Sequence, residues 1–401
     1  MACINENGFY NLITYTNDVR IDHMSTTLVW NMRETIPNDY DYYYLEFKLK
    51  DSFDVFPIDT FIPKDVIARI KNRELYLMIA NYHESFISIV EGIYDSLVIR
   101  DNIPAEQIIL GSGNYDIYTE VRRVSKLKGF PEIRVEWFLE LEYALRDRKL
   151  IMMGSNPEVN PCKPSTLNTL QIKDYPKKYL NFNRRWRLHR PTMVALLYCN
   201  DLLKDGYVSL GDSDDNNNWE RMWPWVNGEA QKNPDIGMMF ARHKDEIVKL
   251  DNLYIDTEDL VTNRAWLDND TDELYNNTYF SLVSETNYFA DRQFDGGRFI
   301  TEKTFKAIAC EHPFILATLP NTLPLLKQLG YKTFDPWIDE SYDSELDDYK
   351  RMLLIVEEVK RLSNLSKNEL LEFLFECKKI TDHNVETLLS KNNWVYRMNY
   401  K

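Results

Sequence analysis

The sequence lacks the features that mark secreted, membrane-spanning and zinc-binding proteins. Its five cysteines are scattered, none forms a CxxC pair, and no histidine has zinc-ligand spacing to a cysteine. This pattern predicts reduced thiols, a cytoplasmic location and no structural metal site. No run of about 18 apolar residues occurs, so no membrane span is expected. The first residues have no basic start followed by an apolar stretch, so no signal peptide is expected.

Positive charge is outnumbered by negative charge, with 48 Lys and Arg residues against 63 Asp and Glu residues. The chain has 401 residues and a formal net charge of −15. This charge opposes nonspecific nucleic-acid binding over the whole surface, because phosphate affinity comes from clustered Lys and Arg. A local basic cleft is compatible with it. Hydrophobic residues make up 44% of the chain, so a sizeable core is expected, in two domains of ordinary size or one unusually large domain.

Short apolar runs alternate with helix-like stretches, which is typical of parallel sheets with crossover helices. In the first half, strands are expected within residues 42–49, 75–80 and 108–110, and a helix from 84 to about 100. In the second half, strands are expected at 179–182, 207–210, 278–284 and 313–317, and helices over 189–204 and from about 301. The last expected helices cover 345–363, about 366–378 and 383–391.

Prolines mark the expected domain boundary. Residues 150–176 lack periodicity and contain Pro157, Pro161, Pro164 and Pro176. We therefore expect an N-terminal domain over 1–175, a second domain over 176–345, and C-terminal helices over 346–401 that pack across both. Two such halves predict an α/β protein with two facing Rossmann-like domains, each with a parallel sheet.

A basic stretch follows the expected strand 179–182. It contains Asn183, Arg184, Arg185, His189 and Arg190, between a strand and the helix that the strand feeds. Ligands bind beyond the carboxyl ends of parallel strands, and a helix N-terminus there favours an anion. Arginine can also hold phosphate oxygens with two hydrogen bonds. The alternative is a solvated basic turn, but the acidic character of the rest of the chain favours anion binding.

A second polar set follows the expected strand 278–284. Glu285 lies at the strand end, and Thr301 is a good N-cap that places Glu302 and Lys303 in the first helical turn. The helix dipole favours Glu302, which could accept hydrogen bonds from sugar hydroxyls, but it opposes Lys303. A residue that opposes a local rule is a candidate for function. The alternative is that both residues decorate an exposed turn.

These motifs resemble the donor-binding segment of GT-B glycosyltransferases over residues 279–320. Residues 177–362 are more narrowly similar to a group of viral and bacteriophage glycosyltransferases, through the stretches 183–190, 301–306, 312–314, 332–335 and 338–343. The resemblance implies that Arg184, Arg185 and Lys303 contact the donor diphosphate, and that Glu302 and Glu285 contact ribose or the transferred sugar. The full set of expected donor-binding residues is Asn183, Arg184, Arg185, His189, Arg190, Thr301, Glu302, Lys303 and Thr304.

The implied activity is sugar transfer from a nucleotide sugar as co-substrate, with no metal or other cofactor required. An inverting enzyme also needs a base near the acceptor hydroxyl. His83 and Glu84 are the favoured candidates, Asp116 is a third, and Glu285 is the catalytic candidate of the second half. Glu84 could equally cap a helix, and a retaining enzyme need not have such a base.

The acceptor stays open between a hydroxymethylated pyrimidine of phage DNA, a glycan and a protein. A duplex acceptor requires base flipping and a basic groove, for which the candidates are Arg122, Arg123, Lys126, Lys128 and Arg134. Two other functions stay open: a non-catalytic viral ligand-binding protein of the same fold, and an NAD-dependent Rossmann enzyme, for which no GxGxxG follows a strand. The Asp212-x-Asp214 pair is similar to a metal-binding DxD, but polar loops often contain this spacing by chance.

Overall fold

The computed structural model describes two compact units. The described residues are 42–46, 58–60, 62–81, 87, 89–138, 142, 175–183, 187–210, 219–250, 253, 272–289, 296–390 and 395–396. Unit 1 comprises Met1–Tyr143, Asp291–Phe299 and Asn392–Lys401, and unit 2 comprises Ala144–Ala290 and Ile300–Lys391. His83, Glu84, Arg184, Arg185 and the Asp212-x-Asp214 pair lie outside the described residues, as does most of the expected boundary at 150–176.

Unit 1 contains a sheet with the strand order β1-β2-β3-β4-β9. Strands β1 (Tyr42–Glu46), β2 (Tyr76–Asn81), β3 (Ile108–Ser112) and β4 (Arg134–Phe138) are parallel, and β9 (Val395–Tyr396) pairs antiparallel with β4. The crossovers contain α2 (Lys64–Lys71), α3 (Ile89–Ile93) with the π-helix Tyr94–Arg100, and α4 (Ile117–Lys128). Short 3₁₀ turns cover Ile58–Thr60 and Ala105–Gln107.

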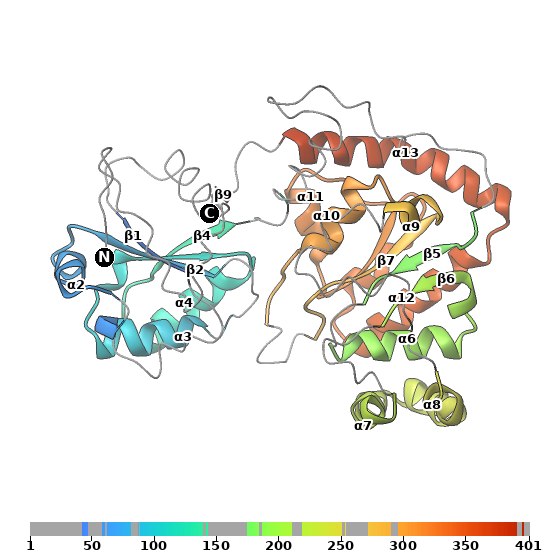
Figure 1. The fold of residues 1–401 in the computed structure, drawn as a ribbon, viewed down its shortest axis with the longest axis horizontal. Helices are drawn as coiled ribbons and strands as arrows, with labels where there is room; N and C mark the ends of the chain where they lie inside the picture. The colour runs from blue at the N-terminus through green and yellow to red at the C-terminus, as the bar shows by residue number, and fades with distance from the viewer. Residues whose placement is uncertain are drawn as a thin grey trace. The chain divides into compact units, whose positions relative to one another are not determined.

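The core of unit 1 lies between this sheet and its helices. All three crossovers advance in the same direction across the sheet, so right-handed connections place their helices on one face. Figure 1 shows α3 and α4 on the same side of the strands. Alternate residues of β2 and β3, including Leu77, Ile79, Ile108 and Leu110, join the buried cluster formed with these helices.

The sheet of unit 2 has the strand order β6-β5-β7-β8. Its strands β5 (Tyr179–Asn181), β6 (Gly206–Val208), β7 (Phe280–Ser284) and β8 (Phe314–Ala317) are parallel. From β5 the chain goes to β6 on one side and then returns to β7 on the other. The strand order therefore reverses between β5 and β7, which is the point where open α/β sheets bind ligands.

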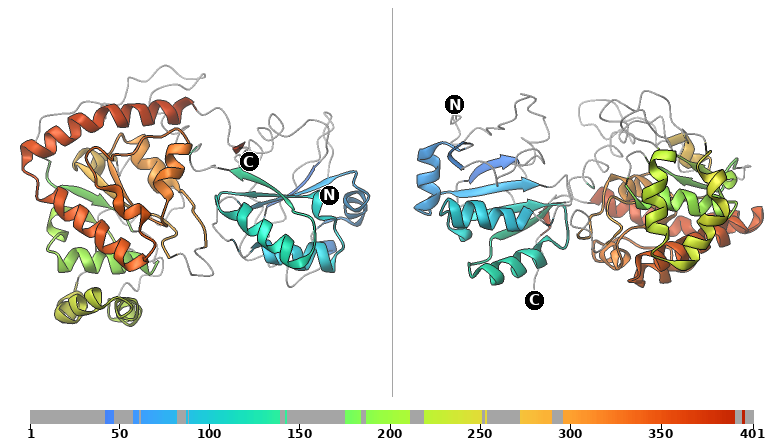
Figure 2. Two further views of the ribbon diagram at one scale, coloured as in Figure 1. Left: turned by 180° about the vertical axis from the view of Figure 1, so that it is seen from behind. Right: turned by 90° about the horizontal axis from the view of Figure 1, so that it is seen from below.

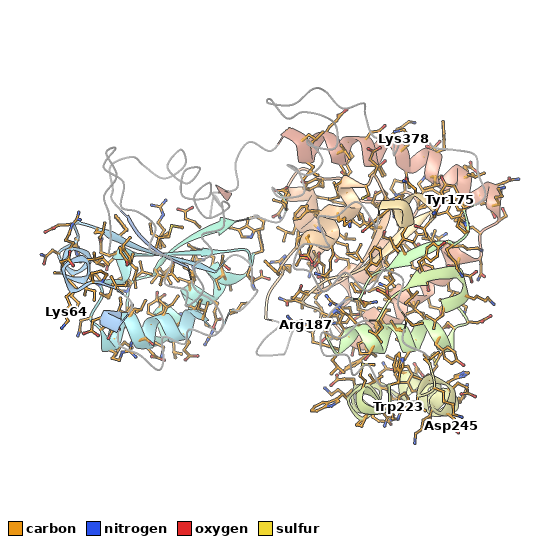
Figure 3. The ribbon with its side chains drawn as sticks, in the orientation of Figure 1. Lys64, Tyr175, Arg187, Trp223, Asp245 and Lys378 are labelled. Carbon is orange, nitrogen blue, oxygen red and sulfur yellow. The ribbon has the colours of Figure 1, made fainter. Side chains whose placement is uncertain are left out.

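Helices cover both faces of this sheet. Figures 1 and 2 show α6 (His189–Cys199) and α12 (Asp348–Ser363) on one face, and α10 (Glu302–Ala309) with α13 (Lys367–Ser390) on the other. Helices α7 (Trp219–Ala230) and α8 (Pro234–Ile247) pack on α6, and Figure 3 labels Trp223 and Asp245 on them. Shorter elements are α9 (Asp272–Asn276), α11 (Thr322–Gln328) and 3₁₀ turns at Leu203–Asp205 and Glu340–Ser344. No helix in the described part of the chain is long and apolar enough to cross a membrane.

The expected α/β class is confirmed, with two sheets built mainly from parallel strands. The stretch 189–204, expected to be mostly helical, contains α6 as far as Cys199 and the start of the 3₁₀ turn Leu203–Asp205. One expectation is wrong, because the separate helices expected at 366–378 and 383–391 form the single helix α13. Helix α13 continues past Asn384 because that side chain accepts a hydrogen bond from Lys332 N at 2.7 Å and donates one to Lys332 O at 2.9 Å. The facing GT-B arrangement of the two domains stays a prediction.

Candidate functional site

Strands β5 and β7 separate at their carboxyl ends. Their ladder contains only the pairs Tyr179–Phe280 and Leu180–Ser281, whereas β5 remains paired with β6 as far as Asn181. The Asn181 side chain spans the separation, because its Nδ2 donates to the Leu282 carbonyl oxygen at 2.6 Å and to Ser284 Oγ at 3.1 Å. The buried Asn181 amide thus supplies the hydrogen bond that the Leu282 carbonyl does not receive from the β5 backbone. After this point, the segment that follows β5 leads to α6 and the segment that follows β7 leads to α10.

Asn183 fixes the turn after β5. Its Nδ2 donates to Asn181 Oδ1 at 2.6 Å and to the Ser209 carbonyl at 3.0 Å, and its backbone N donates to Ser209 Oγ at 3.1 Å. Both partners of Nδ2 are acceptors, so the orientation of the amide is determined. Asn183 Oδ1 is buried without a hydrogen-bond partner among the described residues. Asn183 therefore supports the base of the loop that carries Arg184 and Arg185.

Glu285, immediately after β7, holds the start of α10. Its Oε1 accepts hydrogen bonds from Thr301 N (3.0 Å) and Thr304 Oγ1 (2.5 Å), and its Oε2 accepts from Thr301 Oγ1 (2.5 Å) and Thr286 N (3.2 Å). The side chain is fully buried. Each carboxylate oxygen already has two donors, so the geometry gives Glu285 a positioning role and leaves no free oxygen for catalysis.

Glu302 and Lys303 lie in the first turn of α10, as expected, with Thr301 as the N-cap. Lys303 Nζ lies 2.9 Å from both Thr301 Oγ1 and Glu302 Oε1, and 3.4 Å from Thr286 Oγ1. Burial raises the pKa of Glu302, but the charge and hydrogen bond of Lys303, a backbone hydrogen bond and the charge of Arg190 together lower it below its ordinary value. The Lys303 side chain stays 24% exposed, but its three N–H donors already have these partners, so a phosphate group would have to displace one of them.

His189 and Arg190 begin α6 and contact the end of β7. His189 Nε2 lies 3.0 Å from the Glu285 carbonyl oxygen, and Arg190 Nη2 donates to the carbonyls of Ser284 and Glu285 at 3.3 and 3.2 Å. Because a carbonyl only accepts, Nε2 carries the proton. Burial and the charges of Arg190, Arg187 and Lys303 lower the pKa of His189 far below its ordinary value, although its hydrogen bond to Glu285 raises it. The imidazole is therefore neutral.

Three positive side chains of unit 2, Arg187, Arg190 and Lys303, lie near the end of β7. Arg190 and Lys303 both contact residues 284–286, and Figure 3 labels Arg187 beside the start of α6. The first turns of α6 and α10 add the partial positive charge of helix N-termini. The arrangement is suited to binding phosphate groups. In the described part of the chain, no group of three or more His, Cys, Asp or Glu side chains is placed to hold a metal ion.

Arg351 of α12 is a supporting residue that the sequence interpretation missed. Its buried guanidinium donates to the carbonyls of Thr318 (3.1 Å), Glu345 (2.9 Å) and Tyr288 (2.8 Å), and it lies 4.5 Å from the centroid of the Tyr288 ring. Tyr288 in turn stacks on His189, with ring centroids 5.3 Å apart. Arg351 therefore fixes the ring against which His189 is oriented. An available signal was the spacing of Arg351 with Ile355 and Val359, which puts a charge on the buried face of an amphipathic helix.

His312 belongs to the His-Pro-Phe motif but lies at the amino-terminal ends of β7 and β8, away from the site. Its Nδ1 is 2.8 Å from Ser281 Oγ and its Nε2 is 3.0 Å from the Thr278 carbonyl oxygen. Burial lowers the pKa of His312 to about 4, although the hydrogen bond to Thr278 raises it. This histidine is a neutral structural link between the two strands.

Most of the described candidate residues of unit 1 already form ion pairs with other side chains. The Asp116 carboxylate accepts hydrogen bonds from Arg298 through both oxygens, so it is not free to act as a base. Four of the five proposed DNA-contacting cations form ion pairs with carboxylates: Arg122 with Glu132, Arg123 with Glu120, Lys128 with Asp95 and Glu91, and Arg134 with Glu136. A DNA phosphate would have to displace these carboxylates.

Comparison with known proteins adds no family assignment. No model of a protein family matches the chain, and no curated protein shows significant similarity to it. The resemblance to GT-B glycosyltransferases stays a prediction that rests on the motifs at 183–190 and 301–306. The functional argument therefore depends on the chemistry of these residues.

Proposed function

We propose that the protein is a glycosyltransferase that uses a nucleotide-sugar donor, and that unit 2 binds the donor diphosphate at the starts of α6 and α10. The observation that carries the proposal is the gathering of Arg187, Arg190 and Lys303 where the strand order reverses. Ligands bind at this position in parallel α/β sheets, and helix N-termini stabilise phosphate. The motif resemblance supplies the reaction class.

The proposed roles follow from charge and exposure. Lys303 contacts the diphosphate together with Arg184 and Arg185, which follow β5 in the sequence. When the bond from the sugar to the diphosphate breaks, negative charge grows on the leaving oxygen, and cations already in position stabilise it. The ionised Glu302 accepts hydrogen bonds from ribose or sugar hydroxyls. The acceptor base of an inverting reaction is His83 or Glu84, on the sequence argument alone.

The proposed acceptor is a hydroxyl group on a hydroxymethylated DNA pyrimidine, a glycan or a protein. The ion pairs around α4 count against that helix as a DNA-binding surface. A duplex acceptor would therefore need other cations to hold its phosphates.

Isothermal titration calorimetry tests donor binding. UDP, GDP, ADP, CDP and dTDP are titrated into the wild type, Lys303→Ala and the matched control Lys327→Ala, whose lysine is half-exposed and paired with Asp335 on unit 2. Loss of one charge-assisted contact should raise Kd about tenfold or more in Lys303→Ala. The control should match the wild type. If none of these nucleotides, nor their sugar conjugates, binds the wild type, the transferase proposal fails.

Mass spectrometry tests the transfer step. Donor hydrolysis is first measured for the nucleotide sugars of the base that binds best. Hydroxymethylated duplex DNA, oligosaccharides and peptides are then screened for the mass of an added sugar. Tight nucleotide binding without hydrolysis or transfer would support the non-catalytic ligand-binding alternative.

A further inference from the structure

A carboxylate of the protein already occupies the first turn of α10. Glu302 Oε1 accepts a hydrogen bond from Lys303 Nζ at 2.9 Å. The same carboxylate accepts a hydrogen bond from its own backbone N–H, at the first position of the helix. A helix N–H at this position has no partner inside the helix, and it is one of the donors that bound anions use. Glu302 therefore covers two donors that suit a phosphate, one amide and one ammonium group.

The remaining partners of Lys303 are uncharged hydroxyl groups. Its Nζ lies 2.9 Å from Thr301 Oγ1 and 3.4 Å from Thr286 Oγ1, so Glu302 is the one anion among its described hydrogen-bond partners. Although burial raises the pKa of Glu302, the charges of Lys303 and Arg190 help to lower it below its ordinary value. Glu302 is therefore ionised at neutral pH, and it is an internal anion held by the cations of this site.

An incoming phosphate competes with Glu302 for these donors. If it displaced Thr286 instead, phosphate and carboxylate would lie against one ammonium group, where their like charges repel. The side chains of Glu302 and Lys303 are 23% and 24% exposed, which leaves the carboxylate a path toward solvent. A displaced, partly buried carboxylate needs new hydrogen-bond donors, because a charge without them is costly. Hydroxyl groups of a ligand supply such donors, whereas an inorganic diphosphate has none bound to carbon.

We propose that Glu302 fills the anion site of the unliganded protein and thereby makes this site selective for phosphate compounds that carry hydroxyl groups. A bare anion has to displace the carboxylate without replacing its hydrogen bonds, so it binds weakly. A ligand with both groups exchanges one set of contacts for another. The identification of that ligand as a nucleotide sugar rests on the proposed function, whereas the competition between Glu302 and an anion does not.

Calorimetric titration of the full chain with two ligands tests the proposal. One ligand is inorganic diphosphate, and the other is the sugar conjugate of the nucleoside diphosphate that binds best. The variants are Glu302→Gln, which keeps the shape of the side chain, and Glu302→Ala. Glu357→Gln on α12 is the control, because it removes one exposed carboxylate from the same unit. Thermal melting checks that each variant is folded, and the second substitution at Glu302 keeps the test open if one is not.

Both Glu302 variants should bind inorganic diphosphate about tenfold more tightly than the wild type, because the competing ion pair is gone. The sugar conjugate loses a hydrogen-bond acceptor at the same time, so its affinity should gain less or fall. The selectivity, which is the Kd of diphosphate divided by the Kd of the conjugate, should therefore drop about tenfold or more. Glu357→Gln should keep the wild-type selectivity.

Two outcomes overturn the proposal. If both Glu302 variants bind diphosphate no more tightly than the wild type, the carboxylate does not occupy the site. If the two Kd values change by the same factor, Glu302 acts only through its charge and does not select for hydroxyl groups. If no nucleoside diphosphate or sugar conjugate binds the wild type, the proposed function fails, whereas the diphosphate titration still judges whether Glu302 fills the anion site.

Discussion

Replacement of Glu285 by glutamine separates a positioning role from a catalytic one. The carboxylate accepts four hydrogen bonds, two of them from the backbone amides of Thr301 and Thr286. A Gln side chain has one oxygen, so its NH₂ group must face one of these two amides. The threonine hydroxyls can rotate to accept from NH₂, but a backbone N–H cannot. Glu285→Gln therefore leaves a buried donor unpaired and removes the charge from the remaining bonds.

The expected loss of stability is about 3 kcal/mol, from one unpaired buried donor at 1–3 kcal/mol and weakened charge-assisted bonds. With a urea dependence of about 2–3 kcal/mol per M, the unfolding midpoint should fall by about 1 M. Tryptophan fluorescence follows this transition, because unit 2 contains Trp219, Trp223, Trp225 and Trp337.

Glu357→Gln is the matched control. Its carboxylate is 66% exposed on α12 and lies 3.8 Å from Lys360, so its loss should change stability by less than about 0.5 kcal/mol. If the Glu285→Gln midpoint equals that of the control while sugar transfer is abolished, Glu285 acts in catalysis and the positioning argument is refuted.

Two further predictions concern buried charge. Because the pKa of His312 is lowered from 6.5 to about 4, the unfolded chain binds its proton first, so stability is complete above about pH 6.5 and falls by roughly 3 kcal/mol as the pH drops toward 4. His312→Gln should reduce this slope in urea titrations from pH 4 to 7, and the lowered pKa values of His189 and Glu302 contribute to the slope that remains; an unchanged slope would contradict the assignment. Arg351→Met removes a donor from Asp348 and from three carbonyls, so calorimetric melting should show a loss of about 3–5 kcal/mol, larger than for Lys360→Met at the exposed Lys360–Glu357 pair of the same helix. Equal losses in the two α12 variants would contradict the role of Arg351.

Each strand that an apolar run predicts is present in the structure, because a buried parallel strand needs little beyond a short hydrophobic segment. Residues 75–80, 108–110 and 313–317 illustrate this. Strand β4 was missed because Arg134 and Glu136 interrupt its apolar pattern. In the folded protein these two side chains form an ion pair two residues apart, on the same side of the strand. The two opposite charges on this face of β4 pair with each other, and a search for hydrophobic segments cannot detect such a pairing.

The sequence predicted where the site residues lie in the fold, but it did not predict the contacts that they make. Strand ends and N-caps correctly positioned Glu285, Thr301 and Lys303 around one helix start. The sequence cannot show that Thr301 and Thr304 satisfy the Glu285 carboxylate, because that contact depends on how the intervening loop returns. The contact between Arg298 and Asp116 is likewise hidden from sequence reasoning. Arg298 has no local signal, and its partner Asp116 lies 182 residues earlier in the chain.

The described residues of the site carry little net positive charge. Arg187, Arg190 and Lys303 contribute three positive charges, His189 is neutral, and the carboxylates of Glu285 and Glu302 cancel two of the three. Glu285 also occupies the backbone N–H of Thr301, which reduces the number of helix donors open to a ligand. A diphosphate carries more than one negative charge, so this set alone cannot neutralise it. Arg184 and Arg185 follow directly on Asn183, whose buried amide fixes the base of their loop. Charge balance at the proposed diphosphate site therefore calls for those two arginines in addition to Lys303.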